Sequence, residues 1–174
     1  MFPSSRLNKH LYTQITELKL CQGDDKIVKF ILEKSPFDDD DDDDEVTDEN
    51  SKDFVIIGRI FPNSDIYKEG SFRIEINLNK TFALNPPEVR FLTPIYHPNV
   101  NNDGFISFEL LKRSVHWLHK HSLVAFVRAI VDCIDYPDIE YSLRIALGRE
   151  YMENRSEFNR NALIAVKEYA LPRN

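Results

Sequence analysis

The spacing of apolar residues predicts a helix near the start of the chain, followed by two strands. Between Ser5 and Cys21, four apolar residues recur at steps of four, four and three: Leu7, Leu11, Ile15 and Leu18. Such steps place the four side chains on one face of a helix. The segments 26–33 (KIVKFILE) and 54–61 (FVIIGRIF) are rich in β-branched and aromatic residues, a composition typical of strands.

Polar and apolar residues then alternate from Ser71 to Leu78, which predicts a strand with one buried and one exposed face. A fourth strand, Glu88 to Leu92, is expected after a double proline. The segment 122–135 (SLVAFVRAIVDCID) is apolar at helical spacing and stops before Pro137, so it predicts a helix.

Two closing helices are predicted at 142–154 and 156–170. In the last helix, we expect a buried stripe made of Phe158, Ala162, Ala165 or Val166, and Tyr169. The region between the fourth strand and residue 122 has no clear period. Strands grouped before helices predict an α+β fold: an N-terminal helix, a four-stranded antiparallel meander and three C-terminal helices.

One segment accounts for the acidity of the whole chain. Residues 38–53 hold 11 acidic residues and one lysine, so the segment carries −10 while the full chain carries −7. A run of like charges repels itself and cannot bury apolar area. We therefore expect a disordered acidic insert at about 36–53, between the first two strands of a single domain spanning 1–174. The insert is either a solvated loop without a function of its own, or a segment that steers a basic partner toward the protein by electrostatic attraction.

Length and composition limit the class of protein. The 174 residues, 42% of them hydrophobic, suit one domain with a real core. Two cysteines cannot form a disulfide scaffold, and they favour a reducing compartment, cytoplasmic and/or nuclear. No apolar run approaches the roughly 18 residues of a membrane span, and no basic strip interleaved with aromatics is present. We expect neither a membrane nor a nucleic acid as partner.

The stretch 86–111, PPEVRFLTPIYHPNVNNDGFISFELL, carries the most specific motifs. Its double proline, its His-Pro-Asn tripeptide at 97–99 and its Asp-Gly at 103–104 together resemble the ubiquitin-conjugating enzyme (UBC) family. Further similar segments lie at 67–78, 117, 143–144 and 150–162. The sequences of residues 72–77 and of the C-terminal end are most similar to the subgroup that serves HECT and RING-between-RING ligases. The resemblance implies the UBC fold and a role in ubiquitin conjugation.

In that family, a cysteine eight residues after the motif asparagine accepts ubiquitin as a thioester. Here the matching residue is Ser107, and neither Cys21 nor Cys133 can be aligned with it. A thiol has a pKa of about 8.5, so some nucleophilic thiolate exists at neutral pH, whereas a hydroxyl needs an adjacent base. The resemblance therefore implies a chain that is impaired both in loading and in passing on the modifier.

Other positions also depart from the family pattern. Tyr141 stands where the family usually has an aspartate, or a histidine in the subgroup named above. After the tryptophan, the family usually has a polar residue followed by Pro-Ala, whereas the segment 118–121 of this chain reads Leu-His-Lys-His. Asn99 is retained, and in the family it steadies the active-site loop or the oxyanion of the transition state. His97 and Asn99 have a second interpretation, since the tripeptide also braces a turn in this fold.

Three explanations for Ser107 remain open: a natural non-catalytic variant, a substituted form of an active enzyme, and true serine chemistry. Cys133 falls in an apolar helical pattern, which favours a buried small hydrophobe over a relocated nucleophile. Three histidines near Trp117 suggest either a zinc site or a solvated loop, and lack a completing ligand: His116, His119 and His121. We expect no metal and no cofactor.

The resemblance also implies a ligase-binding surface. Arg6 and Lys9 match basic positions on the family's first helix, and Leu84 stands where the subgroup has a groove-inserting phenylalanine. Leu118 and Lys120 lie in the second ligase-facing loop. The alternative interpretations are ordinary helix surface charges for Arg6 and Lys9, and a packed side chain for Leu84.

Two functional hypotheses follow. The first is a non-catalytic binding module for a ligase, for a genuine conjugating enzyme, or for ubiquitin or a ubiquitin-like protein. The second is an active ubiquitin-conjugating enzyme represented in a Cys-to-Ser form.

Overall fold

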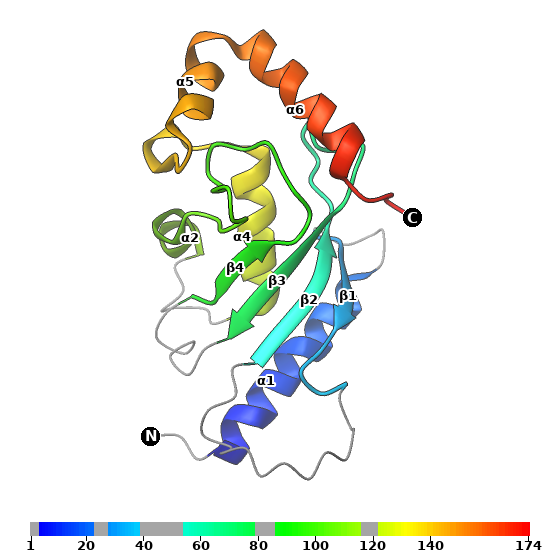
Figure 1. Cartoon of the computed structure of the whole chain (residues 1–174). Helices are drawn as coiled ribbons and strands as arrows, with labels where there is room; N and C mark the ends of the chain where they lie inside the picture. Colours follow the sequence, from blue (N-terminus) through cyan, green and yellow to red (C-terminus); the bar gives the residue numbers. More distant parts are fainter. Residues whose placement is uncertain (1–3, 23–27, 39–53, 79–85, 116–121) are drawn as a thin grey trace.

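The computed structural model describes residues 4–22, 28–38, 54–78, 86–115 and 122–174 (Figure 1). The helices are α1 (Ser4–Lys19), η1 (Leu20–Gln22), α2 (Phe108–Val115), α4 (Leu123–Asp135), η2 (Ile139–Tyr141), α5 (Ile145–Glu153) and α6 (Arg155–Tyr169). The strands are β1 (Phe30–Lys34), β2 (Phe54–Ile60), β3 (Phe72–Leu78) and β4 (Glu88–Phe91). The predicted α+β order of one helix, four strands and three long C-terminal helices is confirmed. Of the acidic insert predicted at about 36–53, residues 39–53 lie outside the described residues.

The four strands form one antiparallel sheet in the order β1-β2-β3-β4, so each strand pairs with its neighbour in sequence. The predicted meander is therefore correct. The register places Phe30 opposite Ile60, and Ile60 opposite Phe72, so buried side chains of adjacent strands lie side by side. The alternation along β3 predicted this buried face, because successive residues of a strand point to opposite sides of a sheet.

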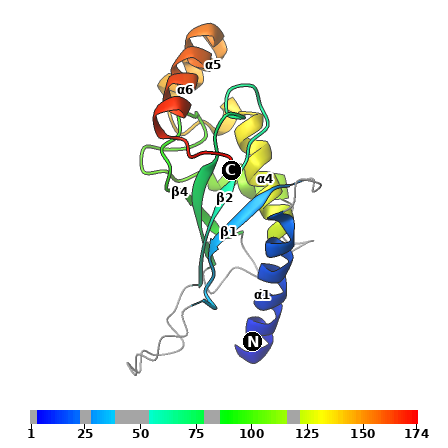
Figure 2. The same ribbon diagram turned by 90° about the vertical axis from the view of Figure 1, so that its right-hand side faces the viewer.

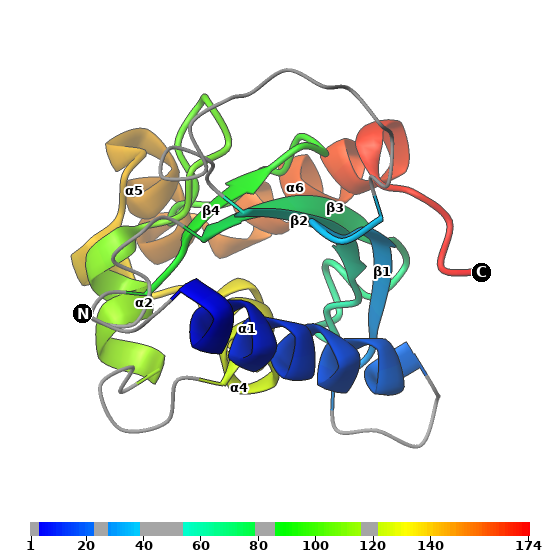
Figure 3. The same cartoon turned by 90° about the horizontal axis from the view of Figure 1, so that it is seen from below.

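Helices α1 and α4 cover one face of the sheet (Figure 3). On α1 the predicted face is buried at Leu11, Ile15 and Leu18, while the side chain of Leu7 is outside the described part of the chain. On α4 the apolar residues pack into the same core, and Cys133 is among them with 4% of its surface exposed. Cys133 is therefore a small core side chain, as its pattern favoured.

The C-terminal helices extend beyond the sheet. Figure 2 shows α5 and α6 at the opposite end of the molecule from the N-terminal end of α1. Phe158, Ala162 and Val166 of α6 are buried as predicted, but Tyr169 is 45% exposed. The prediction for Tyr169 was wrong because α6 ends at this residue, where the chain turns away into an extended tail.

That tail returns to the start of β3. The backbone N–H groups of Ser71 and Leu171 each donate to the other residue's carbonyl, at 2.8 and 2.9 Å. Arg173 Nη1 donates to the carbonyls of Pro62 and Gly70, both at 2.9 Å. These bonds fasten α6 to the sheet. Among the described helices, none combines the length and apolar character needed to cross a membrane.

Helix α2 lies within the region that showed no clear period. It is two turns long, and two adjacent leucines, Leu110 and Leu111, bury it against α4. Two turns hold too few apolar residues to establish a helical period, which is why the sequence pattern did not reveal it. Its charges suit a helix, with Glu109 in the first turn and Lys112 and Arg113 in the last.

Candidate functional site

The His-Pro-Asn tripeptide is part of the core. His97 is fully buried, with Nε2 at 3.1 Å from the carbonyl of Ile134, at the end of α4. Its Nδ1 accepts the backbone N–H of Asn99 at 3.1 Å. Burial lowers the pKa of His97 to about 3, although the bond to Ile134 opposes this. His97 is therefore neutral at physiological pH, and both ring nitrogens are already engaged.

Asn99 holds the loop that follows α4. Its Nδ2 donates to the carbonyl of Asp138 at 2.6 Å, and its Oδ1 accepts the N–H of Asp138 at 3.0 Å. Nearby, the carbonyl of Pro98 accepts the N–H of Leu143 at 2.8 Å. Asp138 in turn caps η2 by accepting the N–H of Glu140 at 3.1 Å. The tripeptide thus braces the loop 138–143, which is the structural role that the sequence left open for it.

The Asp-Gly turn aims the chain at residue 107. Gly104 has φ of +90°, and a Cβ there would lie 2.3 Å from the carbonyl oxygen of Phe91, so glycine is required. After the turn, Val100 and Ile106 form an antiparallel bridge. The next residue, Ser107, donates its N–H to the carbonyl of Asn99 at 3.0 Å. The turn and bridge therefore place Ser107 beside the tripeptide.

Ser107 is enclosed and caps α2. Only 5% of its surface is exposed. Its Oγ accepts the backbone N–H of Leu110 at 3.4 Å, and its carbonyl accepts that of Leu111 at 3.1 Å. An oxygen that accepts from the third residue ahead is the usual arrangement of a serine at a helix N-cap. The hydroxyl oxygen therefore has a structural partner in the resting protein.

Tyr141 contacts α2. Its hydroxyl accepts a hydrogen bond from Arg113 Nη1 at 3.3 Å, and the guanidinium carbon lies 5.8 Å from the ring centroid. The hydrogen bond to Tyr141 raises the pKa of the Arg113 guanidinium, with smaller contributions from Asp138 and Glu140. Sequence reasoning placed Tyr141 in the loop facing residue 107 but did not find Arg113. Only the fold of α2 could have revealed this partner.

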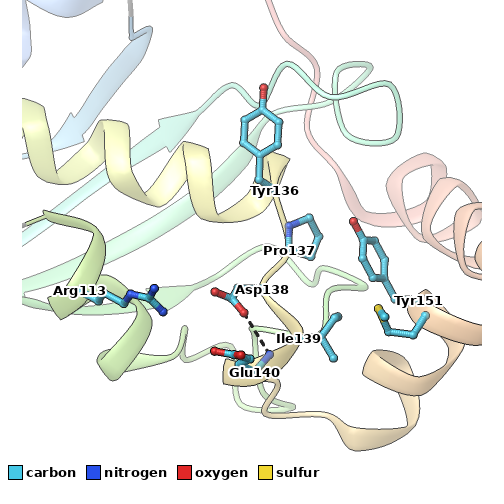
Figure 4. A pocket seen from close by; sticks show the side chains of 8 residues that line it. Arg113, Tyr136, Pro137, Asp138, Ile139, Glu140 and Tyr151 are labelled. Atoms are coloured by element: carbon cyan, nitrogen blue, oxygen red, sulfur yellow. Dashed lines mark hydrogen bonds between the residues drawn. The ribbon is translucent and has the colours of Figure 1, made fainter.

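An open hollow of about 530 Å³ lies between α2, the loop after α4, and α5 (Figure 4). Figure 4 shows Arg113 directed from α2 toward Asp138. The lining is mixed in character: Arg113, Tyr136, Pro137, Asp138, Ile139, Glu140, Tyr151 and Met152. In the described part of the chain, no group of three potential metal ligands comes together.

A second cluster, which the sequence did not indicate, ties the tripeptide segment to the last two helices. Tyr96 donates its hydroxyl to Glu150 Oε2 at 2.5 Å, and Asn161 donates to Glu150 Oε1 at 2.9 Å. The buried Tyr67 hydroxyl donates to the carbonyl of Tyr96 at 2.6 Å. Tyr96 and Glu150 both fall in segments that carry the resemblance, but spacing gave no sign that they meet.

The predicted ligase-binding residues are only partly described. Lys9 is exposed on α1, as a binding role or an ordinary surface charge would both require. Arg6 lies on α1, but its side chain is outside the described part. The other three positions fall outside the described residues: Leu84, Leu118 and Lys120. The same holds for the three histidines near Trp117.

Comparison with known proteins now places the chain. Residues 34–166 match the family model described as "Ubiquitin-conjugating enzyme", which is most of the chain. The chain therefore belongs to the ubiquitin-conjugating enzyme family. A chain from Plasmodium yoelii, described as a candidate ubiquitin conjugating enzyme, has a similar structure with a TM-score of 0.71 at 20% identity. That match covers 98% of this chain and 99% of the other, and confirms the UBC fold.

Several curated relatives are similar at the level of sequence. The chain is 30% identical over 113 residues to "Ubiquitin-conjugating enzyme E2-18 kDa" of Drosophila melanogaster, covering 65% of this chain and 73% of that one. It is 30% identical over 106 residues to "Ubiquitin-conjugating enzyme E2 T" of Homo sapiens, covering 60% and 54%. It is also 30% identical over 115 residues to "NEDD8-conjugating enzyme ubc-12" of Caenorhabditis elegans, covering 63% and 62%. The matched part thus ranges from about half to three quarters of these relatives.

Proposed function

We propose that this chain is a non-catalytic member of its family, in which Ser107 occupies the position of the thioester-forming cysteine. It acts as a binding module for a ligase, for an active conjugating enzyme, or for ubiquitin or a ubiquitin-like protein. The observation that carries the proposal is the burial and the hydrogen bonding of Ser107. Its hydroxyl is enclosed, and its oxygen accepts a backbone N–H of α2.

The surroundings of Ser107 support this proposal. A serine needs a neighbouring base to become a nucleophile. His97 is close in sequence, but Ile134 and Asn99 already engage both of its ring nitrogens. In the described part of the chain the other histidine is His10, which lies on α1. An ester formed at a hydroxyl would also be less reactive than a thioester, so discharge would be slow as well as loading.

Asn99 supports the same view. In a transferase of this family, its amide would be needed near the reacting carbonyl. Here Asp138 engages the side-chain oxygen and one of the two amide hydrogens of Asn99. The tripeptide has a sufficient structural reason to persist without catalysis.

The partners follow from family membership. Relatives named for ubiquitin and for NEDD8 make both modifiers candidates for this chain. The similarity of segment 72–77 and of the C-terminal end to the HECT and RING-between-RING subgroup favours a ligase of that type. Lys9, exposed on α1, would contribute to its docking together with Arg6, Leu84, Leu118 and Lys120. With two cysteines in the chain, both buried, we place the protein in the cytoplasm and/or nucleus.

A second candidate function is an active conjugating enzyme of which this chain is a Cys-to-Ser form. The features that this chain retains favour it. The tripeptide still holds the loop 138–143, and the Asp-Gly turn still places residue 107 beside it. The departure at Tyr141 favours the non-catalytic function, because a single deliberate substitution would have left the other positions unchanged.

A loading assay decides between the two. The chain is incubated with ATP, ubiquitin and its activating enzyme, and in parallel with NEDD8 and its own activating enzyme. Products are then separated on non-reducing gels with and without thiol or hydroxide. We expect no adduct. A thiol-resistant, hydroxide-labile adduct that disappears in Ser107→Ala would mean oxyester chemistry and would overturn the proposal.

The variant Ser107→Cys completes the experiment. Absence of a thioester in this variant would support the non-catalytic function, because it would mean that the site lacks more than the thiol. Rapid thioester formation, followed by transfer to free lysine, would favour the active enzyme. Calorimetric titration of the unaltered chain with ubiquitin, with NEDD8 and with isolated HECT and RING-between-RING domains then identifies the partner.

A further inference from the structure

A side chain of helix α2, Arg113, contacts a side chain of the loop after α4, Tyr141. Arg113, in the last turn of α2, donates to the Tyr141 hydroxyl at 3.3 Å while its guanidinium carbon lies 5.8 Å from the ring centroid. The two residues are 28 positions apart in sequence. A hydrogen bond combined with a cation–π contact fixes the guanidinium more firmly than either contact alone.

Ser107 lies where these two segments meet. The residue begins α2, and its N–H is held by Asn99, whose side chain holds Asp138 in the loop. With 5% of its surface exposed, Ser107 is hidden from solvent in this arrangement. Access to the residue requires either α2 or the loop to move. The loop is anchored by hydrogen bonds at Asp138 and Leu143, and α2 is anchored by Leu110 and Leu111, which are buried against α4. Arg113 and Tyr141 join these two segments directly through their side chains, so their contact adds to these anchors.

We propose that Arg113 and Tyr141 form a latch that holds α2 against the loop after α4 and thereby restricts access to position 107. This inference rests on Ser107 marking the site proposed above. Restricted access would impair the site in addition to the loss of the thiol, because the site stays closed whether position 107 carries an oxygen or a sulfur. A partner that competed for Arg113 or for the Tyr141 ring would open it.

Thiol alkylation measures the opening directly. The substitution Ser107→Cys introduces a reporter thiol, and every comparison is made within this background. The modification rate at position 107 by excess N-ethylmaleimide is followed by peptide mass spectrometry. When closing is faster than alkylation, this rate reports the population of the open state. Cys133, buried in α4, serves as an internal reporter of general unfolding.

The variants separate the latch from general destabilisation. Arg113→Ala and Tyr141→Ala should each raise alkylation at position 107 by at least about threefold, the scale expected of a single cation–π contact. Tyr141→Phe keeps the ring and loses the hydrogen bond, so its rate should fall between. Lys112→Ala removes the neighbouring exposed cation of α2 and should leave the rate within about 1.5-fold of the background. Cys133 should react at one rate in all variants.

Three results would overturn the latch. The first is equal alkylation at position 107 with and without Arg113. The second is a rise at Cys133 that parallels the rise at position 107. The third is alkylation in the intact background at the rate of an exposed thiol. None of these depends on loading by an activating enzyme, so the latch and the proposed function can fail separately.

Discussion

The side-chain amide of Asn99 pairs with both backbone polar groups of Asp138, donating at 2.6 Å and accepting at 3.0 Å. Two residues earlier, His97 makes a similar bond to the carbonyl of Ile134. Together they attach the tripeptide segment to the end of α4 and to the loop that follows. Residues 39 positions apart are thereby held together.

Replacing Asn99 by alanine should loosen this loop. The change leaves the N–H and the carbonyl of Asp138 without their side-chain partner, and we expect a loss of about 2 kcal/mol in the free energy of unfolding. Urea denaturation measures the loss, and amide hydrogen exchange at Asp138 should accelerate. The control is Asn102→Ala at an exposed position, which should stay within about 0.5 kcal/mol of the unaltered chain. Unchanged exchange at Asp138 in Asn99→Ala would contradict the bracing role.

His97 should make the protein sensitive to mild acid. Its pKa is lowered to about 3 by burial, well below the value of about 6.5 of an unfolded chain. The unfolded state therefore binds more protons between these values, and stability is lost as the pH falls below about 6.5. From pH 7 to pH 5 the loss from this group should be about 2 kcal/mol.

Urea titrations at several pH values test this dependence. His97→Gln should show a flatter profile between pH 7 and pH 5, and His10→Gln, on the exposed side of α1, should keep the original slope. Should His97→Gln fail to fold, the imidazole resonances of the unaltered chain provide the measurement. A midpoint near pH 6.5 for His97 would contradict the buried, neutral state.

The strands and the long helices could be predicted because their apolar residues repeat with a clear period. The alternation of β3 and the apolar run of α4 each specify a face, and the structure buries those faces. Helix α2 escaped prediction because, among its described side chains, only Leu110 and Leu111 are buried. Tyr169 was assigned to a buried stripe because periodicity does not reveal where a helix ends.

The site is harder to predict for a different reason. The resemblance to the family pointed to His97, Asn99, Ser107 and Tyr141 and left open whether the tripeptide braces a turn, but it did not identify the residues that they contact. The pairs that define the site join residues 28 to 39 positions apart: Asn99 with Asp138, His97 with Ile134, and Arg113 with Tyr141. Such contacts depend on the folded topology, so only the structure distinguishes a bracing asparagine from one available for catalysis.

The capping role of Ser107 predicts a specific order of stabilities. Ser107→Ala should lower the free energy of unfolding by about 1 kcal/mol, while Ser107→Gly should lose only a few tenths, because glycine is tolerated at an N-cap. Ser107→Cys should resemble alanine, since a thiol is a weak acceptor. A matched control exists at Ser122, which caps α4 by accepting the N–H of Ala125 at 3.3 Å. Ser122→Ala should lose a similar amount, and a neutral Ser107→Ala beside a destabilised Ser122→Ala would exclude the cap.

The C-terminal tail should contribute measurably to stability through Arg173. Its Nη1 donates to two backbone carbonyls, of Pro62 and Gly70, and its guanidinium carbon lies 5.4 Å from the centroid of the buried Phe61 ring. Hydrogen bonds from a cation are stronger than neutral ones, but partial solvent exposure reduces the gain.

We therefore expect Arg173→Ala to lower the free energy of unfolding by about 1 to 2 kcal/mol. Arg173→Lys should recover part of the loss, because an ammonium keeps the charge but not the planar fork that fits over an aromatic ring. Thermal and urea unfolding measure both variants. Lys167→Ala, an exposed position near the end of α6, is the control and should change little. A neutral Arg173→Ala would mean that the bonds of Leu171 and Pro172 to Ser71 hold α6 in place without it.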